Sequence, residues 1–157
     1  MPNVQSEIVI KAPLELTWSI AQDVEKLPDI LPDLDALKVL EREQMADGTT
    51  RVISEWHGRI KQFNRKISWT EEDFWDNTAH TCTFKQTKGD FDVYEGVWKF
   101  EAIDESSTRA VLDVTYVFDV PLLGALLQKV VKNIMQGNAD DTLKYLGIEA
   151  EKQANNI

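Results

Sequence analysis

A change of hydrophobic period at Pro121 constrains the fold of this chain more than any other feature. Before it, apolar and polar residues alternate in short segments, which is typical of half-buried strands. After it, apolar residues recur every three or four positions from Leu123 to Leu146, which is typical of an amphipathic helix. A helix continuing to about Gln153 would be ~48 Å long at 1.5 Å per residue. Since the expected radius of gyration is ~15 Å, this helix must cross the whole molecule.

Seven segments carry the strand pattern, and short polar turns separate most of them. Asp47-Gly48 is a strong hairpin signal between the second and third segments. Two short helices, one beginning near Pro13 and one spanning 24–31, separate the first segment from the second. Strands joined by short turns form an antiparallel meander. The expected strands are Val4–Ile10, Ala36–Arg42, Thr50–Arg59, Phe63–Phe74, Ala79–Thr87, Phe91–Ile103 and Thr108–Val120.

These elements predict a single α+β domain over residues 1–157, since 157 residues match roughly one domain of about 150. An antiparallel sheet of this size buries one face, and the C-terminal helix must cover that face. A helix about 10 Å wide is too narrow to fill the hollow of a strongly curved sheet of about seven strands. We therefore expect a cavity between the helix and the sheet.

The charge balance and the cysteine count exclude several classes of protein. With 17 Lys and Arg against 27 Asp and Glu, the formal net charge is −10, and such a charge repels nucleic-acid phosphates. The first twenty residues lack the pattern of a secretory signal, and no apolar run approaches the ~20 residues of a membrane span. We expect a cytoplasmic protein without stable membrane insertion. A single cysteine, Cys82, excludes an internal disulfide and a cysteine-built zinc site.

Aromatic side chains gather on the face that the alternation turns inward. Any one of them is most often a core residue, because an aromatic side chain buries about 150–250 Å². As a set beneath a single helix they favour a pocket for a flat or apolar ligand. Asn138 lies within the apolar stripe of the helix, where its amide needs a buried partner or a ligand. The candidate ligand-binding residues are Ser54, Trp56, Trp69, Phe84, Tyr94, Trp98, Phe100, Tyr116, Phe118, Ile134 and Asn138.

Glu71 and Asp73 are the candidate catalytic pair. They lie two positions apart on one expected strand, so both carboxyl groups can face the cavity. In an apolar pocket the pKa of one of them is raised, and that group can act as an acid or a base. The other interpretation is that both are solvated near the strand end at Asp76-Asn77, and we expect this commoner state of carboxylates.

Three further features each have a structural and a functional interpretation. His80 and Cys82 are expected on one strand face with His57 nearby, but the spacing of known metal sites is missing, so no metal is expected. No cofactor is expected either, because phosphate-binding loops and dinucleotide fingerprints are absent. Basic residues in 59–66 form an exposed hairpin rim or guide an anionic head group. The apolar link Pro121–Leu127 closes the end of the sheet or acts as a lid.

The order of elements and several motifs resemble the helix-grip fold of the Bet v 1/START-like (SRPBCC) superfamily. The opening motifs are similar to those of its polyketide cyclase/dehydrase and coenzyme-Q-binding (Coq10-like) branch. The resemblance implies a curved sheet around a long C-terminal helix and a hydrophobic ligand held between them, although a fold does not fix a function. The segments that carry it are Glu7–Trp18, Asp23–Pro28, Val39–Arg42, Gly89–Phe91 and Gly96–Phe100.

The resemblance also implies pocket residues, and this sequence departs from them. Aromatase/cyclases of this branch carry a pocket serine and arginine two and four positions after the tryptophan that corresponds to Trp69. This chain has Glu71 and Asp73 there, and Leu34 at the position of a pocket tyrosine. Two carboxylates disfavour the enolate-like charge that cyclisation develops.

We therefore expect the binding or carriage of a hydrophobic or aromatic small molecule. One alternative is an enzyme of the polyketide cyclase, aromatase or dehydratase type that uses Glu71 and Asp73. The other alternative is an accessory protein that handles a quinone or a lipid. The oligomeric state has no signature in the sequence.

Overall fold

The computed structural model describes residues 1–118 and 124–156, with the side chains of the C-terminal helix from Leu127 onward. Seven strands form one antiparallel sheet in the order β1-β7-β6-β5-β4-β3-β2. β2 to β7 form a meander and β1 pairs with β7, which confirms the predicted topology. The strands are β1 (Asn3–Ile10), β2 (Leu34–Gln44), β3 (Thr50–Ile60), β4 (Arg65–Asp76), β5 (Thr81–Gly89), β6 (Val93–Asp104) and β7 (Ser107–Val117).

Short helices connect β1 to β2, as predicted. They are α1 (Leu14–Gln22), the 3₁₀ turn η1 (Val24–Lys26) and α2 (Leu27–Ile30). The expected second helix over 24–31 is therefore split into a 3₁₀ turn and a single α-helical turn. Because these segments are short, they contribute to the fold by packing against the sheet and the C-terminal helix and not by their own stability.

Three expected strands begin two residues too early, each because the chain turns where the apolar pattern continues, and β7 ends at Val117 before the expected Val120. Phe63 belongs to the 3₁₀ turn η2 (Lys61–Phe63), which ends at Asn64 in the left-handed conformation, with φ 48°. His80 is also left-handed, with φ 55°, so β5 begins after it. Phe91 precedes β6, although its side chain is buried.

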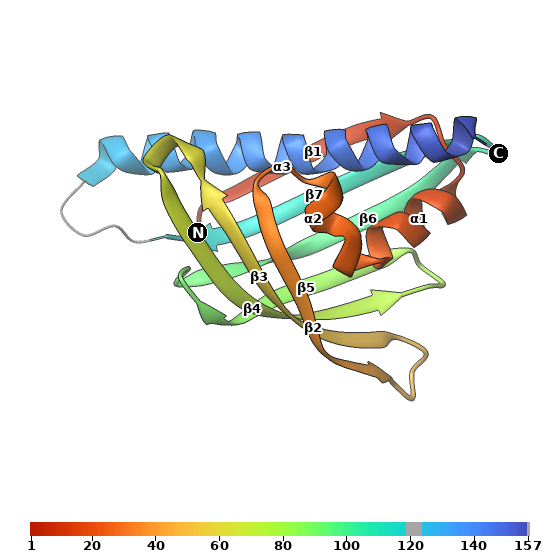
Figure 1. The fold of residues 1–157 in the computed structure, drawn as a ribbon, viewed down its shortest axis with the longest axis horizontal. Helices are drawn as coiled ribbons and strands as arrows, with labels where there is room; N and C mark the ends of the chain where they lie inside the picture. The colour runs from red at the N-terminus through yellow and green to blue at the C-terminus, as the bar shows by residue number, and fades with distance from the viewer. Residues whose placement is uncertain (119–123, 157) are drawn as a thin grey trace.

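The helix α3 (Gly124–Asn155) is continuous over 32 residues, as the apolar spacing predicted. Figure 1 shows it running the length of the molecule, alongside β1, and its main packing partner is β1. Gly137 and Gly147, which each lower the helix propensity, both lie within the unbroken helix. Within the ranges described, no helix is both long enough and apolar enough to span a bilayer. The proposed lid, Pro121–Leu127, lies outside the described residues except at its C-terminal end.

The predicted inward face of the sheet is confirmed. On β3, Val52, Ser54, Trp56 and Gly58 are buried, and their neighbours in sequence are partly or fully exposed. On β6, a Cβ atom at Gly96 would overlap the carbonyl oxygen of Asp113 and lie 2.7 Å from Cζ of Phe84. A glycine therefore allows β7 and the Phe84 ring to approach β6 closely at this point. The concave face formed in this way points toward α3 (Figure 1).

Candidate functional site

A cavity of about 210 Å³ lies between the concave face of the sheet and α3. Its walls come from β3 to β7, from the turn before β2, and from the face of α3 between Ile134 and Tyr145. The prediction that one helix leaves the hollow of the sheet unfilled is therefore confirmed. An apolar cavity of ~150 Å³ accommodates benzene, so this volume accommodates a one- or two-ring aromatic molecule.

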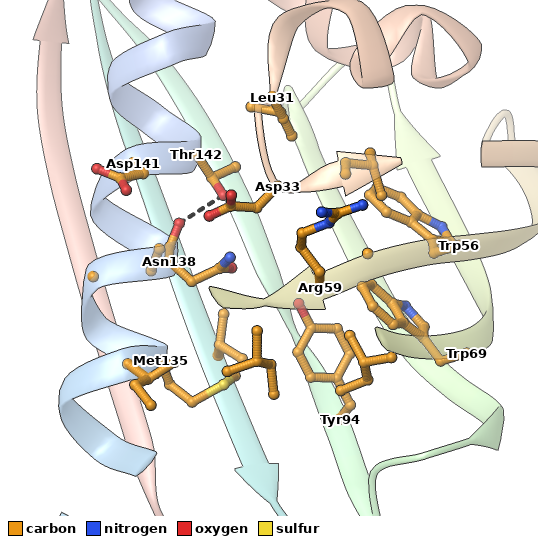
Figure 2. A pocket seen from close by; sticks show the side chains of 18 of the residues that line it. Leu31, Asp33, Trp56, Arg59, Trp69, Tyr94, Met135, Asn138, Asp141 and Thr142 are labelled. Atoms are coloured by element: carbon orange, nitrogen blue, oxygen red, sulfur yellow. Dashed lines mark hydrogen bonds between the residues drawn. The ribbon is translucent and has the colours of Figure 1, made fainter. Parts of the chain in front are cut away.

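Stacked aromatic rings form the sheet side of the cavity. The rings of Trp56 and Trp69 are stacked with centroids 5.5 Å apart, and Tyr94 lies 5.2 Å from Trp69. Tyr94 in turn stacks on Phe91 at 4.5 Å. Figure 2 shows the two indoles and the phenol around one space, opposite Met135 and Asn138 of α3. This wall offers ring faces to a ligand, the surface that a flat apolar molecule requires.

The polar atoms of these aromatic residues have different roles. Nε1 of Trp56 donates to Oγ of Ser54 at 2.8 Å, and Nε1 of Trp69 donates to Oε1 of Glu71 at 2.7 Å. Both indoles are thereby held in place by the sheet. The hydroxyl of Tyr94 points into the cavity in Figure 2, and it has no hydrogen-bond partner among the described residues. Tyr94 is therefore the aromatic residue whose polar group is available to a ligand.

Glu71 and Asp73 are buried on the inner face of β4. The two residues are only 4% and 2% exposed, and their carboxyl groups are close enough to interact electrostatically. Glu71 lines the cavity, whereas Asp73 lies behind it. The expectation that both are solvated was wrong: the strand continues to Asp76, so the alternation keeps both positions inside.

Burial raises the pKa of both carboxyl groups, and for Asp73 the neighbouring charge of Glu71 raises it further. The residues opposite Glu71 are Ser54 on β3 and Gln86 on β5, and neither carries a charge. Arg51 pairs with Glu72, on the other face of β4, at 2.6 Å. No cation among the described residues therefore compensates the buried pair, so nothing opposes the effect of burial, which favours the protonated form of each carboxyl group.

Burial also isolates Oδ1 of Asp73. This atom is inaccessible and has no hydrogen-bond partner among the described residues, and the same holds for Nε1 of Trp75, two positions along the strand. Burial raises the pKa of the nearby Cys82 thiol and of the Tyr94 phenol, with additional contributions from Glu71 and Asp73. Cys82 and Tyr94 therefore remain neutral beside the acid pair.

Charged residues surround the mouth of the cavity. Nζ of Lys61 lies 3.0 Å from Oδ1 of Asp33, and Arg59 pairs with Asp35 at 3.2 Å. Asp33 raises the pKa of the Lys61 ammonium. Figure 2 shows Asp33 and Arg59 on the side of the cavity facing Thr142 of α3. The mouth therefore carries both signs of charge.

The basic residues in 59–66 are exposed, as predicted, but they do not form one cluster. Arg59 and Lys61 line the cavity mouth and are paired with acids. The guanidinium of Arg65 instead lies over the Phe118 ring, 5.2 Å from its centroid, and Lys66 does not line the cavity.

The structure brings seven of the predicted ligand-binding residues to the cavity and places four elsewhere. Ser54 lies behind Trp56, and Tyr116 is in the core. Phe100 packs on Trp18 and Trp98, with centroids 5.6 and 6.2 Å away. The fourth, Phe118, packs against Phe91. The seven that line the cavity are Trp56, Trp69, Phe84, Tyr94, Trp98, Ile134 and Asn138.

Asn138 was expected to need a buried partner, but it is exposed at the rim of the cavity. Sequence reasoning missed Phe91 and Met135 among the lining residues. Phe91 lies in a turn, where no helical or strand periodicity indicates whether a side chain faces the cavity. Met135 and Ala139, in contrast, follow the helical spacing of four toward the sheet, a signal that could have identified both.

The three residues considered as metal ligands lie apart. Nε2 of His57 contacts Glu55 at 2.8 Å on the outer face, and Nε2 of His80 contacts Glu15 of α1 at 2.8 Å. Because His80 is left-handed and precedes β5, it does not share a strand face with Cys82, which corrects the expectation. In the part of the chain that the structure describes, no three His, Cys, Asp or Glu side chains form a group that could hold a metal ion.

Comparisons with known proteins agree with this architecture. The structure of TTHA0849 from Thermus thermophilus is similar, with a TM-score of 0.88 and 36% identity over 98% of this chain and 99% of that one. The Zhui aromatase/cyclase from a Streptomyces species has the same fold, with a TM-score of 0.86 and 19% identity over 96% and 94%. A putative polyketide cyclase of Streptomyces halstedii is 29% identical over 104 residues, 66% of this chain and 91% of the relative.

The family assignment rests on a longer match. The family model described as polyketide cyclase / dehydrase and lipid transport matches residues 10–142, which is most of the chain. The matched range includes the strands β2 to β7 in full and only the last residue of β1. The match ends within α3, at the position of Thr142, and therefore covers most of the cavity wall. The chain belongs to the polyketide cyclase/dehydrase and lipid transport family of the SRPBCC superfamily.

Proposed function

We propose that this protein binds and carries a small hydrophobic or aromatic molecule in the cavity between the sheet and α3. The observation that carries this proposal is the aromatic-walled cavity of about 210 Å³. The stacked indoles of Trp56 and Trp69 supply flat apolar surface, and the Tyr94 hydroxyl supplies a polar contact. Cavities lined by aromatic residues with a few polar groups are the usual sites of small-molecule binding.

A panel of quinones, aromatic polyketides, sterols and fatty acids tests this proposal by thermal shift. A ligand at 100 times its dissociation constant stabilises the native state by about 2.7 kcal/mol, which raises Tm by about 5–10 °C in a domain of this size. Native mass spectrometry of protein purified from its source cells would identify a retained molecule. The absence of a shift from every compound, together with no retained molecule, would refute the proposal.

The chain offers a matched pair of variants for locating the ligand. Gly137 lies at the exposed rim of the cavity, and no heavy atom is within 4 Å of a Cβ atom added there. Gly137→Phe places a ring at the mouth and should abolish the shift, whereas Gly137→Ala should preserve it. Equal shifts in both variants would place the ligand outside this cavity.

A second candidate function is catalysis of the cyclase or dehydratase type. The observation that favours it is the carboxyl group of Glu71, which faces the cavity with a raised pKa and is backed by Asp73. Such a group can donate or accept a proton at a bound substrate. Once a ligand is identified, Glu71→Gln should abolish any turnover and leave binding intact. Unchanged turnover in this variant would exclude the acid pair as catalyst.

A further inference from the structure

We propose that Glu71 and Asp73 form a charge filter at the buried end of the cavity, which accepts a neutral hydroxyl group of an aromatic ligand and rejects a carboxylate. This inference rests on the proposed binding function and adds the polar chemistry of the ligand. The ligand class it names is a phenol or an enol. These two positions therefore determine specificity, whether or not they also take part in catalysis.

The geometry of the buried end shows what a ligand would meet there. Glu71 reaches the cavity surface, with Oε1 bound to Nε1 of Trp69 at 2.7 Å and with Asp73 beside it. Tyr94 lines the same cavity, and its ring centroid lies 5.2 Å from that of Trp69. The buried end therefore combines a carboxyl group that can accept a hydrogen bond with a phenol that can donate one.

A hydroxyl group matches this arrangement because it both donates and accepts. Its proton can be accepted by the Glu71 carboxyl group, and its oxygen can accept the proton of the Tyr94 hydroxyl. An ether or a carbonyl oxygen of the ligand lacks the proton that Glu71 would accept. The predicted order of affinity is therefore hydroxyl above ether.

A ligand that carries a carboxylate in place of the hydroxyl group is disfavoured at the buried end. The carboxyl groups of Glu71 and Asp73 are buried side by side on β4, with no cation opposite them on β3 or β5 among the described residues. The cations that line the cavity, Arg59 and Lys61, lie at its mouth and are already paired with Asp35 and Asp33. A ligand carboxylate at the buried end would lose its hydration at low dielectric with two acidic side chains and no cation beside it, and such an environment strongly disfavours binding.

The remaining titratable groups near the pair do not change this conclusion. On β5, the buried Cys82 is neutral because burial raises its pKa, and on β6 the phenol of Tyr94 is neutral for the same reason. The inner face of β3 presents Ser54 and Trp56 there, and neither titrates. On α3, Asp141 is among the residues that line the cavity, and its negative charge also opposes an anion.

Three naphthalene derivatives of similar size test the filter by calorimetry at pH 7. They are 2-naphthol, 2-methoxynaphthalene and 2-naphthoate. We expect 2-naphthol to bind about tenfold or more tightly than 2-naphthoate, and more tightly than the methoxy compound. In the variant Glu71→Gln/Asp73→Asn, which is neutral and nearly isosteric, the preference for naphthol over naphthoate should fall to within about threefold. The control Glu72→Gln, on the other face of β4, should keep the wild-type ratio.

Each contrary result has one meaning. Equal or tighter binding of 2-naphthoate by the wild type, or an unchanged ratio in the double variant, would overturn the filter and leave the cavity as a general aromatic site. Equal binding of naphthol and its methyl ether would overturn the assigned hydroxyl. Binding of none of the three compounds would overturn the assignment of an aromatic alcohol as the ligand, and only together with a negative thermal-shift panel and no retained molecule would it overturn the proposed binding function. Circular dichroism establishes that each variant is folded, and Glu71→Gln alone replaces the double variant should the latter fail to fold.

Discussion

The acid pair of β4 should make the stability of this protein fall as the pH rises. In the unfolded chain both carboxyl groups titrate near pH 4, whereas burial raises the pKa of Glu71 and Asp73 in the native state. Above pH 4 the native state therefore holds a proton that the unfolded state has released. The stabilising effect of that proton is fully present below the unfolded pKa and is lost as the pH rises toward the native pKa.

The magnitude follows from this difference of one proton. The free energy of unfolding changes by about 1.4 kcal/mol per pH unit for one proton. Between pH 5 and pH 7 the loss approaches about 2.7 kcal/mol for as long as the native pair keeps its proton. In a domain of this size that loss lowers Tm by about 5–10 °C.

Urea denaturation of the wild type and of Glu71→Gln/Asp73→Asn at several pH values measures this effect. The wild type should lose stability relative to the variant as the pH rises from 5 to 7. His57 and His80 are common to both proteins, so their titration cancels in the difference. Glu72→Gln should show the wild-type pH response, because Glu72 lies on the other face and pairs with Arg51. A difference that does not change with pH, or that grows in favour of the wild type, would refute the reasoning.

Four other substitutions test the packing and a surface ion pair by urea or thermal denaturation. Gly137→Ala should stabilise the protein by about 1 kcal/mol, because alanine favours the helix and its Cβ meets no atom within 4 Å; Gly147→Ala should gain less, because its Cβ would lie 3.2 Å from Ile10. Gly96→Ala should destabilise by about 1–3 kcal/mol through overlap with β7, and a neutral result would contradict the close strand approach. Lys61→Met should change stability by less than about 1 kcal/mol, because the Lys61 side chain is 63% exposed and the Asp33 side chain keeps access to water at 31%.

The elements that the sequence predicted well are those with a regular period. Alternation assigned the inner faces of β3, β6 and β7, since a strand with one buried face repeats every two residues. The spacing of three and four identified α3. The cavity was predicted because one helix is too narrow to fill the hollow of a curved sheet. This argument does not depend on any individual side-chain contact.

The sequence failed where a local conformation or a neighbour from another strand decides the outcome. The left-handed conformation of His80 delays the start of β5, and the amino-acid composition does not reveal this conformation. The burial of Glu71 and Asp73 depends on the length of β4 and on the aromatic wall around it, which come from distant parts of the chain. A buried carboxyl group and a solvated one come from the same residue types, so only the fold shows which of them is buried.

Because α3 packs mainly on one edge of the sheet, the side chains that hold it in the fold differ from those that face the cavity. The helix is held chiefly by β1 at one edge of the sheet, while none of the residues that line the cavity comes from β1. The side chains that α3 presents to the cavity, such as Ile134 and Asn138, therefore contribute little to the contact with β1. Exchanging them can reshape the space for a guest molecule while the scaffold persists, which makes this helix face the natural place to redesign selectivity.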